Sequence, residues 1–344
     1  MRAVTITSYG GPEVVRVQDV PDPPPPGPGE IQLRVRAAAL NHLDLFVIRG
    51  LPGVQHSFPH TVGSDISGEV VSVGARVSRV RPGDSVLVNP GSWCGSCELC
   101  AAGEECLCER YGVRGEQGAG LFSELVNLPE SNVERVAAGH SWAEAAAYPL
   151  ATLTAWRMLV TRAQLKPGES VLIWGIGGGV ALQALQVAKH VGARVIVTSS
   201  SDAKLERARQ LGADAVVNHG RDDVPKAVRA FSGKRGADVV VDCVGQATWE
   251  ISTRALARTG RLVTCGGTSG PLVTMDVRKL FWHHWSILGS TMGNTREFRR
   301  IAELFSSGEL KPVVDSVIPF DQARSAFERL ERGEQFGKVV LEVA

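Results

Sequence analysis

Four cysteines lie close together in the sequence, at the spacing of a metal site. They follow the pattern Cys94-x2-Cys97-x2-Cys100-x7-Cys108. Thiolates at these intervals can surround one tetrahedral zinc ion, and four ligands leave that ion no open position for a substrate. A reduced loop without metal is the alternative, and Cys106 competes as a fourth ligand. The spacing predicts a structural zinc ion, which means that any chemistry must lie elsewhere.

A glycine-rich turn is the second candidate site. The turn lies between an apolar strand-like segment and a helical one, and it reads Gly175-Ile176-Gly177-Gly178-Gly179-Val180-Ala181. A strict Gly-x-Gly-x-x-Gly pattern fails at Val180, but Gly-x-x-Gly-x-x-Ala fits, because Ala181 is small enough for close packing of helix on strand. A plain turn is the alternative. Because strand, turn, helix and second strand follow in the right order, we predict that Gly175, Gly178, Gly179 and Val180 bind a dinucleotide pyrophosphate.

The end of the second strand bears on which dinucleotide is bound. An NAD enzyme usually carries an acidic residue there to hold the ribose hydroxyls, but this chain has Ser199 at that position, with Lys204 five residues later. Hydroxyls and a lysine suit a 2′-phosphate. We therefore predict NADP(H) in preference to NAD(H). Asp202 is close enough to take the acidic role instead, and the serines can also cap the next helix.

The elements around these motifs predict an α/β protein. From about Glu169, strands and helices alternate, which is typical of a doubly wound parallel sheet, the Rossmann fold. The expected strands of this region are 170–174, 194–198, 215–217, 238–242, 261–265 and 286–289, and the expected helices include 180–191 and 202–211. The first half of the chain reads as short strands separated by turns, at 31–38, 68–73 and 85–89. Helices near 297–305 and 322–332 and a closing strand at 338–343 complete the chain, so both ends are expected to form the second domain.

Composition excludes several classes of partner. The 344 residues carry a net charge of only +1, so we expect no strong electrostatic attraction to nucleic acid or to an anionic membrane. The first residues, MRAVTITSYG, have no apolar run typical of a signal peptide, and no stretch is long enough for a membrane helix. Four of the seven cysteines cluster at metal spacing, so a cytoplasmic location is the simpler interpretation.

Taken together, the motifs resemble the medium-chain dehydrogenase/reductase superfamily along essentially the whole chain. The motifs that carry the resemblance are Gly10-Gly-Pro12-Glu, Asn41-x-x-Asp44, Gly63-x-Asp65-x-x-Gly68, Pro82-Gly83-Asp84 and Gly337-Lys338-Val-Val. The resemblance implies a GroES-like, mainly β catalytic domain at 1–150 and 291–344, with a zinc lobe at 91–110. It also implies a Rossmann domain at 151–290 and a homodimer or homotetramer, for which Trp282–Leu288 is a plausible seam.

The positions at which zinc alcohol dehydrogenases bind a catalytic metal carry other residue types in this chain. Zinc alcohol dehydrogenases carry a cysteine where this chain has Asn41, a histidine where it has Ser64, and a cysteine or acid near Leu150. A proton-relaying hydroxyl would fall at Leu43. Since a catalytic zinc needs about three protein ligands, we expect none here. The pattern looks instead like quinone oxidoreductases, which implies hydride transfer to a quinone or a carbonyl-activated alkene.

The resemblance also assigns roles to single residues, each with a plainer alternative. Asn41, Asp44, Ser64 and Thr154 are the catalytic candidates. Asn41 can instead stabilise its loop, Asp44 and Asp65 can anchor the cleft, and Thr154 can be a helix-start hydroxyl. Further cofactor contacts are assigned to His42, Thr154 and Ser290.

The remaining histidines and the alternative functions stay open. His56 and His60 are possible proton donors, although surface positions are commoner, and the pair His283-His284 suggests an aromatic cover or a subunit contact. The leading hypothesis is an NAD(P)H-dependent oxidoreductase acting on a small molecule without catalytic zinc. The alternatives are an alcohol or aldehyde dehydrogenase of the zinc type and a cofactor-binding protein without turnover.

Overall fold

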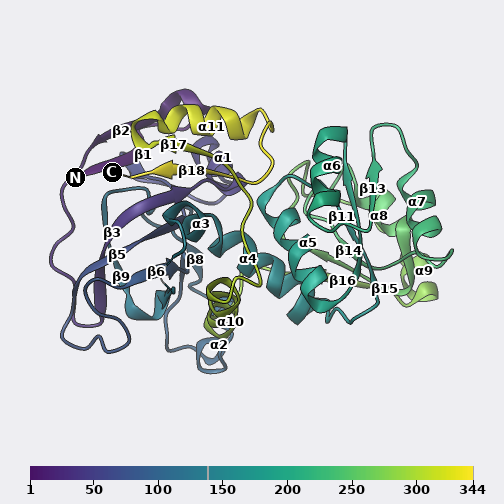
Figure 1. Cartoon of the computed structure of the whole chain (residues 1–344), viewed down its shortest axis with the longest axis horizontal. Helices are drawn as coiled ribbons and strands as arrows, with labels where there is room; N and C mark the ends of the chain where they lie inside the picture. The colour runs from purple at the N-terminus through teal and green to yellow at the C-terminus, as the bar shows by residue number, and fades with distance from the viewer. Residues whose placement is uncertain (138, 344) are drawn as a thin grey trace. The chain divides into compact units, whose positions relative to one another are not determined.

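The chain folds into two compact units, each with its own core. The structure is a computed structural model that describes residues 1–137 and 139–343 (Figure 1). The first unit comprises residues 1–151 and 293–344, and the second comprises residues 152–292. The middle of the chain therefore forms one unit, while both of its ends form the other.

The first unit is built mainly from β-strands. Its strands are β1 (Arg2–Ile6), β2 (Val15–Asp19), β3 (Glu30–Ala39), β4 (His60–Thr61), β5 (Asp65–Val73), β6 (Ser85–Val88), β7 (Gly91–Ser92), β8 (Gly112–Val113), β9 (Leu125–Pro129), β10 (Val133–Arg135), β17 (Val314–Pro319) and β18 (Lys338–Glu342). A seven-stranded sheet has the order β10-β6-β5-β3-β18-β17, with β9 also paired to β3. The long strand β3 alternates buried and exposed residues over much of its length, as a sheet with one face on a core requires.

Helices close the first unit. They are α1 (His42–Arg49), α2 (Glu98–Ala101), α3 (Trp142–Ala147), α10 (Thr295–Ser306) and α11 (Ala323–Glu331), with 3-10 turns η1 (Pro12–Val14), η2 (Glu105–Leu107), η3 (Glu130–Asn132) and η5 (Phe320–Gln322). Asn294 and Glu297 cap the start of α10 reciprocally, each side chain accepting a bond from the other's backbone N–H.

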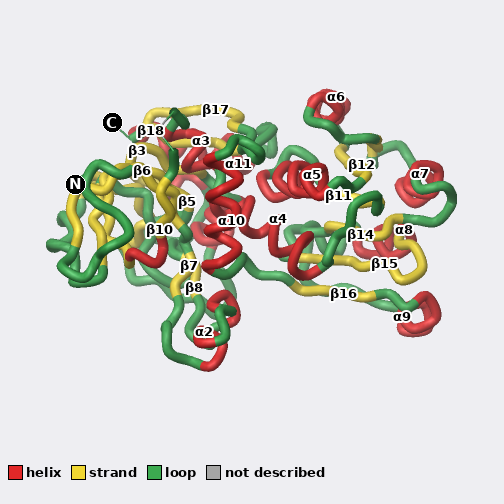
Figure 2. Tube along the Cα trace, turned by 60° about the horizontal axis from the view of Figure 1, so that its bottom comes forward, coloured by secondary structure: helices red, strands yellow, loops and turns green. Residues whose placement is uncertain are grey.

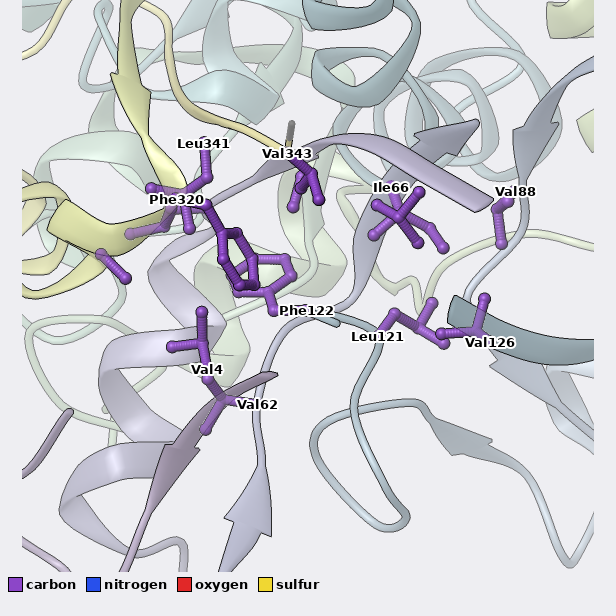
Figure 3. Close-up of a cluster of buried hydrophobic side chains, with 14 of the residues drawn as sticks. Val4, Val62, Ile66, Val88, Leu121, Phe122, Val126, Phe320, Leu341 and Val343 are labelled. Atoms are coloured by element: carbon purple, nitrogen blue, oxygen red, sulfur yellow. The ribbon is translucent and has the colours of Figure 1, made fainter. Parts of the chain in front are cut away.

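The core of the first unit joins residues from both ends of the chain. Figure 3 shows Val4 and Val62 beside Phe122, with Leu341 and Val343 of the C-terminal segment close by. Phe122 is completely buried. A side chain at Gly63 would collide with this ring, since an added Cβ would lie 2.0 Å from it. The backbone that leads into Ser64 is therefore set by core packing.

The second unit is a parallel sheet with helices around it (Figure 2). Its elements are β11 (Ser170–Ile173), α5 (Gly179–Val191), β12 (Arg194–Ser199), α6 (Asp202–Gln210), β13 (Ala215–Asn218), α7 (Val224–Phe231), β14 (Ala237–Val241), α8 (Trp249–Ala255), β15 (Leu256–Thr264), α9 (Val277–His283) and β16 (Ser286–Gly289). The spatial order β13-β12-β11-β14-β15-β16 corresponds to 3-2-1-4-5-6 within the unit, which is the doubly wound order of dinucleotide-binding folds. The predicted α/β class with a parallel sheet is confirmed.

The helix between the two halves of the chain is irregular. Helix α4 (Pro149–Trp156) continues as a π-helical segment, η4 (Arg157–Arg162).

Among the described residues, no helix combines the length and the apolar character that a membrane span requires.

Candidate functional site

The four cysteines of the predicted lobe converge in the structure. All four sulfur atoms lie within 4.8 Å of one another, and those of Cys94 and Cys100 are 3.9 Å apart. A tetrahedral zinc site with Zn–S bonds of about 2.3 Å places its sulfur atoms about 3.8 Å apart. The quartet therefore fits one zinc ion, which Cys94, Cys97, Cys100 and Cys108 would hold. Cys106 is buried nearby but is not a member of this group.

Backbone N–H groups prepare the sulfur atoms of the lobe for a metal. Cys94 Sγ accepts bonds from the N–H groups of Ser96 (3.4 Å) and Cys97 (3.3 Å). These donors lower the pKa of Cys94 to about 5. Burial raises the pKa of Cys100 to about 12, so this thiol needs a metal to release its proton at neutral pH.

The lobe is also tied to the start of α10. Glu105 accepts bonds from the backbone N–H (3.2 Å) and the hydroxyl (2.8 Å) of Thr295. A carboxylate at a helix N-terminus is favoured by the free N–H groups and the helix dipole. The lobe therefore contributes to the cap of a helix that lies almost 200 positions further along the chain.

A buried polar cluster lies where zinc alcohol dehydrogenases carry catalytic ligands. The ammonium group of Lys338 donates to Asn41 Oδ1 (2.5 Å) and to Asp65 Oδ2 (2.9 Å). Asn41 Nδ2 in turn donates to Asp65 Oδ2 (2.9 Å), and the backbone N–H of Leu150 donates to Asp65 Oδ1 (2.9 Å). The side chains of Lys338 and Asp65 are 4% and 0% exposed, so the ion pair is almost dry. Both ends of the Asn41 amide are therefore bonded within the protein.

Asp44 belongs to the same cluster, but its carboxyl group is not fully charged near neutral pH. Its Oδ2 accepts the backbone N–H of Asn41 (2.7 Å) at the start of α1, while its buried Oδ1 has no hydrogen-bond partner. Burial raises the pKa of Asp44 to about 7, against the opposing effects of that bond and of Lys338. Near neutral pH this carboxyl is only partly ionised.

The other predicted residues of the first unit have structural partners. Ser64 is 1% exposed, and its hydroxyl donates to the carbonyl of Arg114 (2.7 Å) rather than toward Asn41. His42 is exposed, and its ring packs edge-on against Phe46 with centroids 5.0 Å apart. Partial desolvation, followed by the charge of Arg49, lowers the pKa of His42.

His56 and His60 form a stacked pair with ring centroids 4.0 Å apart. His56 Nε2 bonds the carbonyl of Glu116 (2.6 Å), and its Nδ1 lies 3.2 Å from the hydroxyl of Tyr9. His60 Nε2 bonds the carbonyl of Gly115 (3.0 Å). A surface position is wrong for His60, which is 7% exposed, and desolvation lowers its pKa.

In the second unit, the glycine turn has the backbone that a pyrophosphate requires. Gly175 and Gly177 have φ of 69° and 122°, which side chains rarely tolerate. An added Cβ at Gly175 would meet nothing within 4 Å, and one at Gly178 only the carbonyl of Gly175. Gly178 is the N-cap of the 13-residue helix α5. Open space above a helix N-terminus is a suitable site for a phosphate, so the turn fits a dinucleotide.

The end of β12 is arranged around Asp202. Arg221 binds this carboxylate through two bonds (2.7 and 2.8 Å), and Asn218 adds a third (2.9 Å). Ser199 is 7% exposed, and its hydroxyl accepts the N–H of Ser201, whose own hydroxyl caps α6. Asp202 is therefore already paired with a cation.

Two further cofactor candidates lie in the second unit. Thr154 is buried inside α4, where its hydroxyl contacts Met292 Sδ (3.6 Å), so a position at the start of the helix is wrong for it. Ser290 follows β16 and donates its backbone N–H to Thr264. The hydroxyl oxygen of Ser290 is buried and has no hydrogen-bond partner among the described residues.

Comparison with known proteins identifies the family. Residues 27–138 match the model of the alcohol dehydrogenase GroES-like domain, and residues 179–307 match that of the zinc-binding dehydrogenases. The NAD-dependent alcohol dehydrogenase of Sulfolobus acidocaldarius is 31% identical, over 100% of both chains. The chain belongs to the zinc-type alcohol dehydrogenases of the medium-chain dehydrogenase/reductase superfamily.

Two further relatives of the chain are an alcohol dehydrogenase of known structure and a reductase. A crystal structure of an NAD-dependent alcohol dehydrogenase superposes with a TM-score of 0.95, at 45% identity over 100% of both chains. The acryloyl-coenzyme A reductase of Metallosphaera sedula is 31% identical over 99% of both chains. The protein is thus an oxidoreductase of a family that includes both alcohol dehydrogenases and an enoyl-thioester reductase.

Sequence reasoning missed several residues of these sites. The sequence pattern places Lys338 in a terminal motif and gives it no role, although a lysine in an otherwise apolar strand indicates a buried partner. Gly177 lies within the predicted glycine turn, but its positive φ cannot be predicted from the sequence pattern. Asn218 is the last residue of the third strand of the unit, β13, and Arg221 follows it; this strand ends at the same edge of the sheet as the second.

Proposed function

We propose that this dehydrogenase uses NADPH to reduce a quinone or an alkene conjugated to a carbonyl group, without a catalytic zinc. The observation that carries the proposal is the Lys338 ammonium, bonded to both Asn41 and Asp65. At the family's metal-ligand positions this chain offers an amide, a hydroxyl and a leucine. Among the described residues, the only group of three or more His, Cys, Asp or Glu that converges on a metal-sized point is the cysteine quartet. The ammonium of Lys338 neutralises Asp65, and the ligand positions Asn41, Ser64 and Leu150 supply neither a thiolate nor an imidazole.

The chemistry of the acceptor supports this assignment. An alkene conjugated to a carbonyl accepts hydride at its β-carbon, and the negative charge moves to the carbonyl oxygen before a proton reaches the α-carbon. Such an acceptor is already polarised, so orientation and hydrogen bonds can replace a Lewis acid. The relative named for acryloyl-coenzyme A acts on a substrate of this class. In this proposal Asn41 and Lys338 are positioning residues, because their polar atoms are bonded to each other and to Asp65.

The preference for NADPH rests on the end of β12. A free acid at this position would hold the ribose hydroxyls of NAD, but Asp202 is bound by Arg221 and Asn218. Lys204 lies one turn into the helix that follows Ser199 and adds a positive charge near the expected 2′-phosphate, which would also compete with Asp202 for the guanidinium of Arg221. Relatives named as NAD-dependent favour the other nucleotide. A titration in which NADH binds more than tenfold tighter than NADPH would overturn this preference.

The test of the whole proposal is a screen of nucleotide oxidation on protein of known zinc content. NADPH and NADH are each offered with quinones, enones, enoyl thioesters, aldehydes and simple ketones. We expect about one zinc per chain, turnover with the conjugated acceptors, and poor turnover with simple ketones. Two zinc ions per chain together with oxidation of primary alcohols by NAD would overturn it.

Zinc-type alcohol or aldehyde dehydrogenation is the second candidate function. The names of the 31%-identical Sulfolobus relative and of the 45%-identical crystal structure favour it. The same screen separates the two, because an alcohol dehydrogenase without its metal has no strong group to stabilise an alkoxide. Tight nucleotide binding without turnover of any acceptor would favour a role without catalysis.

We further propose that two copies of the chain pair through β16. Among the described residues, this strand is at the edge of the second unit's sheet and pairs with β15 alone. Beside it in sequence, Val277, Phe281 and Trp282 of α9 are 63%, 61% and 68% exposed. A charged residue on the edge strand, Ile287→Lys, is expected to convert a dimer into monomers in light scattering. Unchanged mass would reject this seam.

A further inference from the structure

Two thiols outside the cysteine quartet lie in contact. Cys243 Sγ and Cys265 Sγ are 3.1 Å apart, and both residues are partly exposed. They follow strands β14 and β15, which are neighbours in the parallel sheet. The proposed reduction does not use either thiol.

The register of the two strands explains why the thiols meet. Val241 of β14 pairs with Val263 of β15. Cys243 lies two residues after Val241, and Cys265 lies two residues after Val263. Neighbouring strands are about 4.8 Å apart, a separation within the Cα range that a disulfide tolerates. A disulfide would bring the sulfur atoms to about 2.05 Å, so closure needs a movement of only about 1 Å.

The local hydrogen bonds make the two thiols unequal. The bond between the two thiols is the main cause that lowers the pKa of Cys243 and raises the pKa of Cys265. The neighbouring Asp242 opposes the ionisation of Cys243. Its own carboxylate is bound by the backbone N–H groups of Val244 and Gly245, and by the hydroxyls of Thr248 and Ser252. Cys243 is therefore the better nucleophile, and Cys265 is placed to resolve a mixed disulfide.

The pair lies at the edge of the sheet that carries the cofactor turn. Strand β14 is adjacent to β11, whose carboxyl end leads into the glycine turn. In doubly wound sheets, ligands bind outside the carboxyl ends of the strands. The loops after β14 and β15 are already joined by bonds from Ser269 N–H to Val244 O (2.8 Å) and from Gln246 N–H to Gly270 O (3.1 Å). A disulfide between Cys243 and Cys265 would therefore constrain two loops that are already hydrogen-bonded to each other.

We propose that Cys243 and Cys265 form a reversible dithiol–disulfide switch whose disulfide form weakens binding of the nicotinamide cofactor. The inference takes only cofactor binding from the proposed function, and the identity of the acceptor plays no part in it. The oxidant is a low-molecular-weight disulfide, RSSR. The Cys243 thiolate attacks one sulfur of RSSR and releases RS⁻, which takes up a proton. Cys265, losing its proton, then attacks Cys243 Sγ and releases a second RS⁻. Two protein thiols and RSSR thus become one protein disulfide and two RSH.

The switch is tested on full-length, zinc-loaded protein treated with oxidised glutathione. We expect a 243–265 cross-linked peptide in mass spectrometry, and a Kd for NADPH that rises about fivefold or more. Dithiothreitol restores the original Kd. By reciprocity, a fivefold coupling means that saturating NADPH raises the midpoint potential of the pair by about 20 mV.

Controls separate this pair from the zinc lobe and from the proposed function. Cys243→Ser and Cys265→Ser each keep a small polar group at the site and are expected to lose the oxidation response while binding NADPH as before. Zinc release is followed in parallel. Absence of the cross-linked peptide, an unchanged Kd after cross-linking, or a rise in Kd in the serine variants as large as that in the natural protein would overturn the switch. A reduced protein that binds neither nucleotide overturns the proposed function, and the regulatory part of the inference with it.

Discussion

The cysteine lobe and the buried polar cluster lie at the two places where zinc-type dehydrogenases hold metal, yet their chemistry differs. The lobe keeps four sulfur atoms within 4.8 Å of one another. The polar cluster has an amide at Asn41, and the ammonium of Lys338 bonds to this amide and to the carboxylate of Asp65. Within one fold, four thiols thus converge in one region, whereas a buried ion pair with an amide lies in the other. Membership in a zinc family therefore describes the scaffold, while the ligands at each position describe the chemistry.

The largest expected effect comes from breaking the ion pair of the polar cluster. Lys338→Met leaves Asp65 buried without its cation, and we expect a loss of about 3–5 kcal/mol in the free energy of unfolding. Urea unfolding measures it. The double variant Lys338→Met with Asp65→Asn removes both charges and is expected to be more stable than Lys338→Met alone. A double variant no better than the single one would mean that packing around the lysine, rather than the charge pair, stabilises the cluster.

The pH dependence of the free energy of unfolding tests the raised pKa of Asp44 in the polar cluster. Its pKa is raised to about 7 in the folded protein, whereas an unfolded chain releases this proton near pH 3.9. The folded state therefore keeps this proton up to a higher pH than the unfolded chain does. The contribution of the proton to the free energy of unfolding is complete below about pH 4 and is lost as the pH rises through 7. Asp44→Asn cannot ionise, so its advantage over the natural protein should grow by about 3 kcal/mol between pH 5 and pH 8. Asp19→Asn, at an exposed position, is the control. A parallel pH profile for Asp44→Asn and the natural protein would contradict the raised pKa.

The lobe is tested by removing one ligand and one bystander. Cys97→Ser is expected to lose the zinc ion, measured by elemental analysis. With free zinc a hundredfold above its Kd, the lost stability is about 2.7 kcal/mol. Cys106→Ser should keep one zinc per chain, because Cys106 lies outside the quartet. If the hydride chemistry is independent of this metal, folded Cys97→Ser retains turnover. Zinc loss in Cys106→Ser instead would transfer the fourth ligand to that residue.

Much of the fold was predictable because its signals are local. The apolar strands of the second unit and the glycine turn before α5 are short-range patterns, and β11 and α5 lie within one residue of their predicted limits. The quartet was predictable for the same reason, since its ligands span 15 positions. The polar cluster was not, because Lys338 reaches Asn41 across 297 positions. The contact between Cys243 and Cys265 likewise depends on strand register, which neither segment reveals alone.

The smallest expected effect concerns how the lobe acts beyond its metal. Glu105 accepts two bonds from Thr295 at the start of α10, and a charged acceptor at a helix N-terminus is worth about 1–2 kcal/mol. Glu105→Gln keeps the size of the side chain and removes its charge, so we expect a loss of about 1 kcal/mol in urea unfolding, with zinc content unchanged. Glu98→Gln, an exposed position in α2, should have almost no effect. If zinc removal abolishes the difference between Glu105→Gln and the natural protein, the metal holds Glu105 in place. The lobe then stabilises α10 through its metal, whereas the polar cluster stabilises its own surroundings through the ion pair of Lys338 and Asp65.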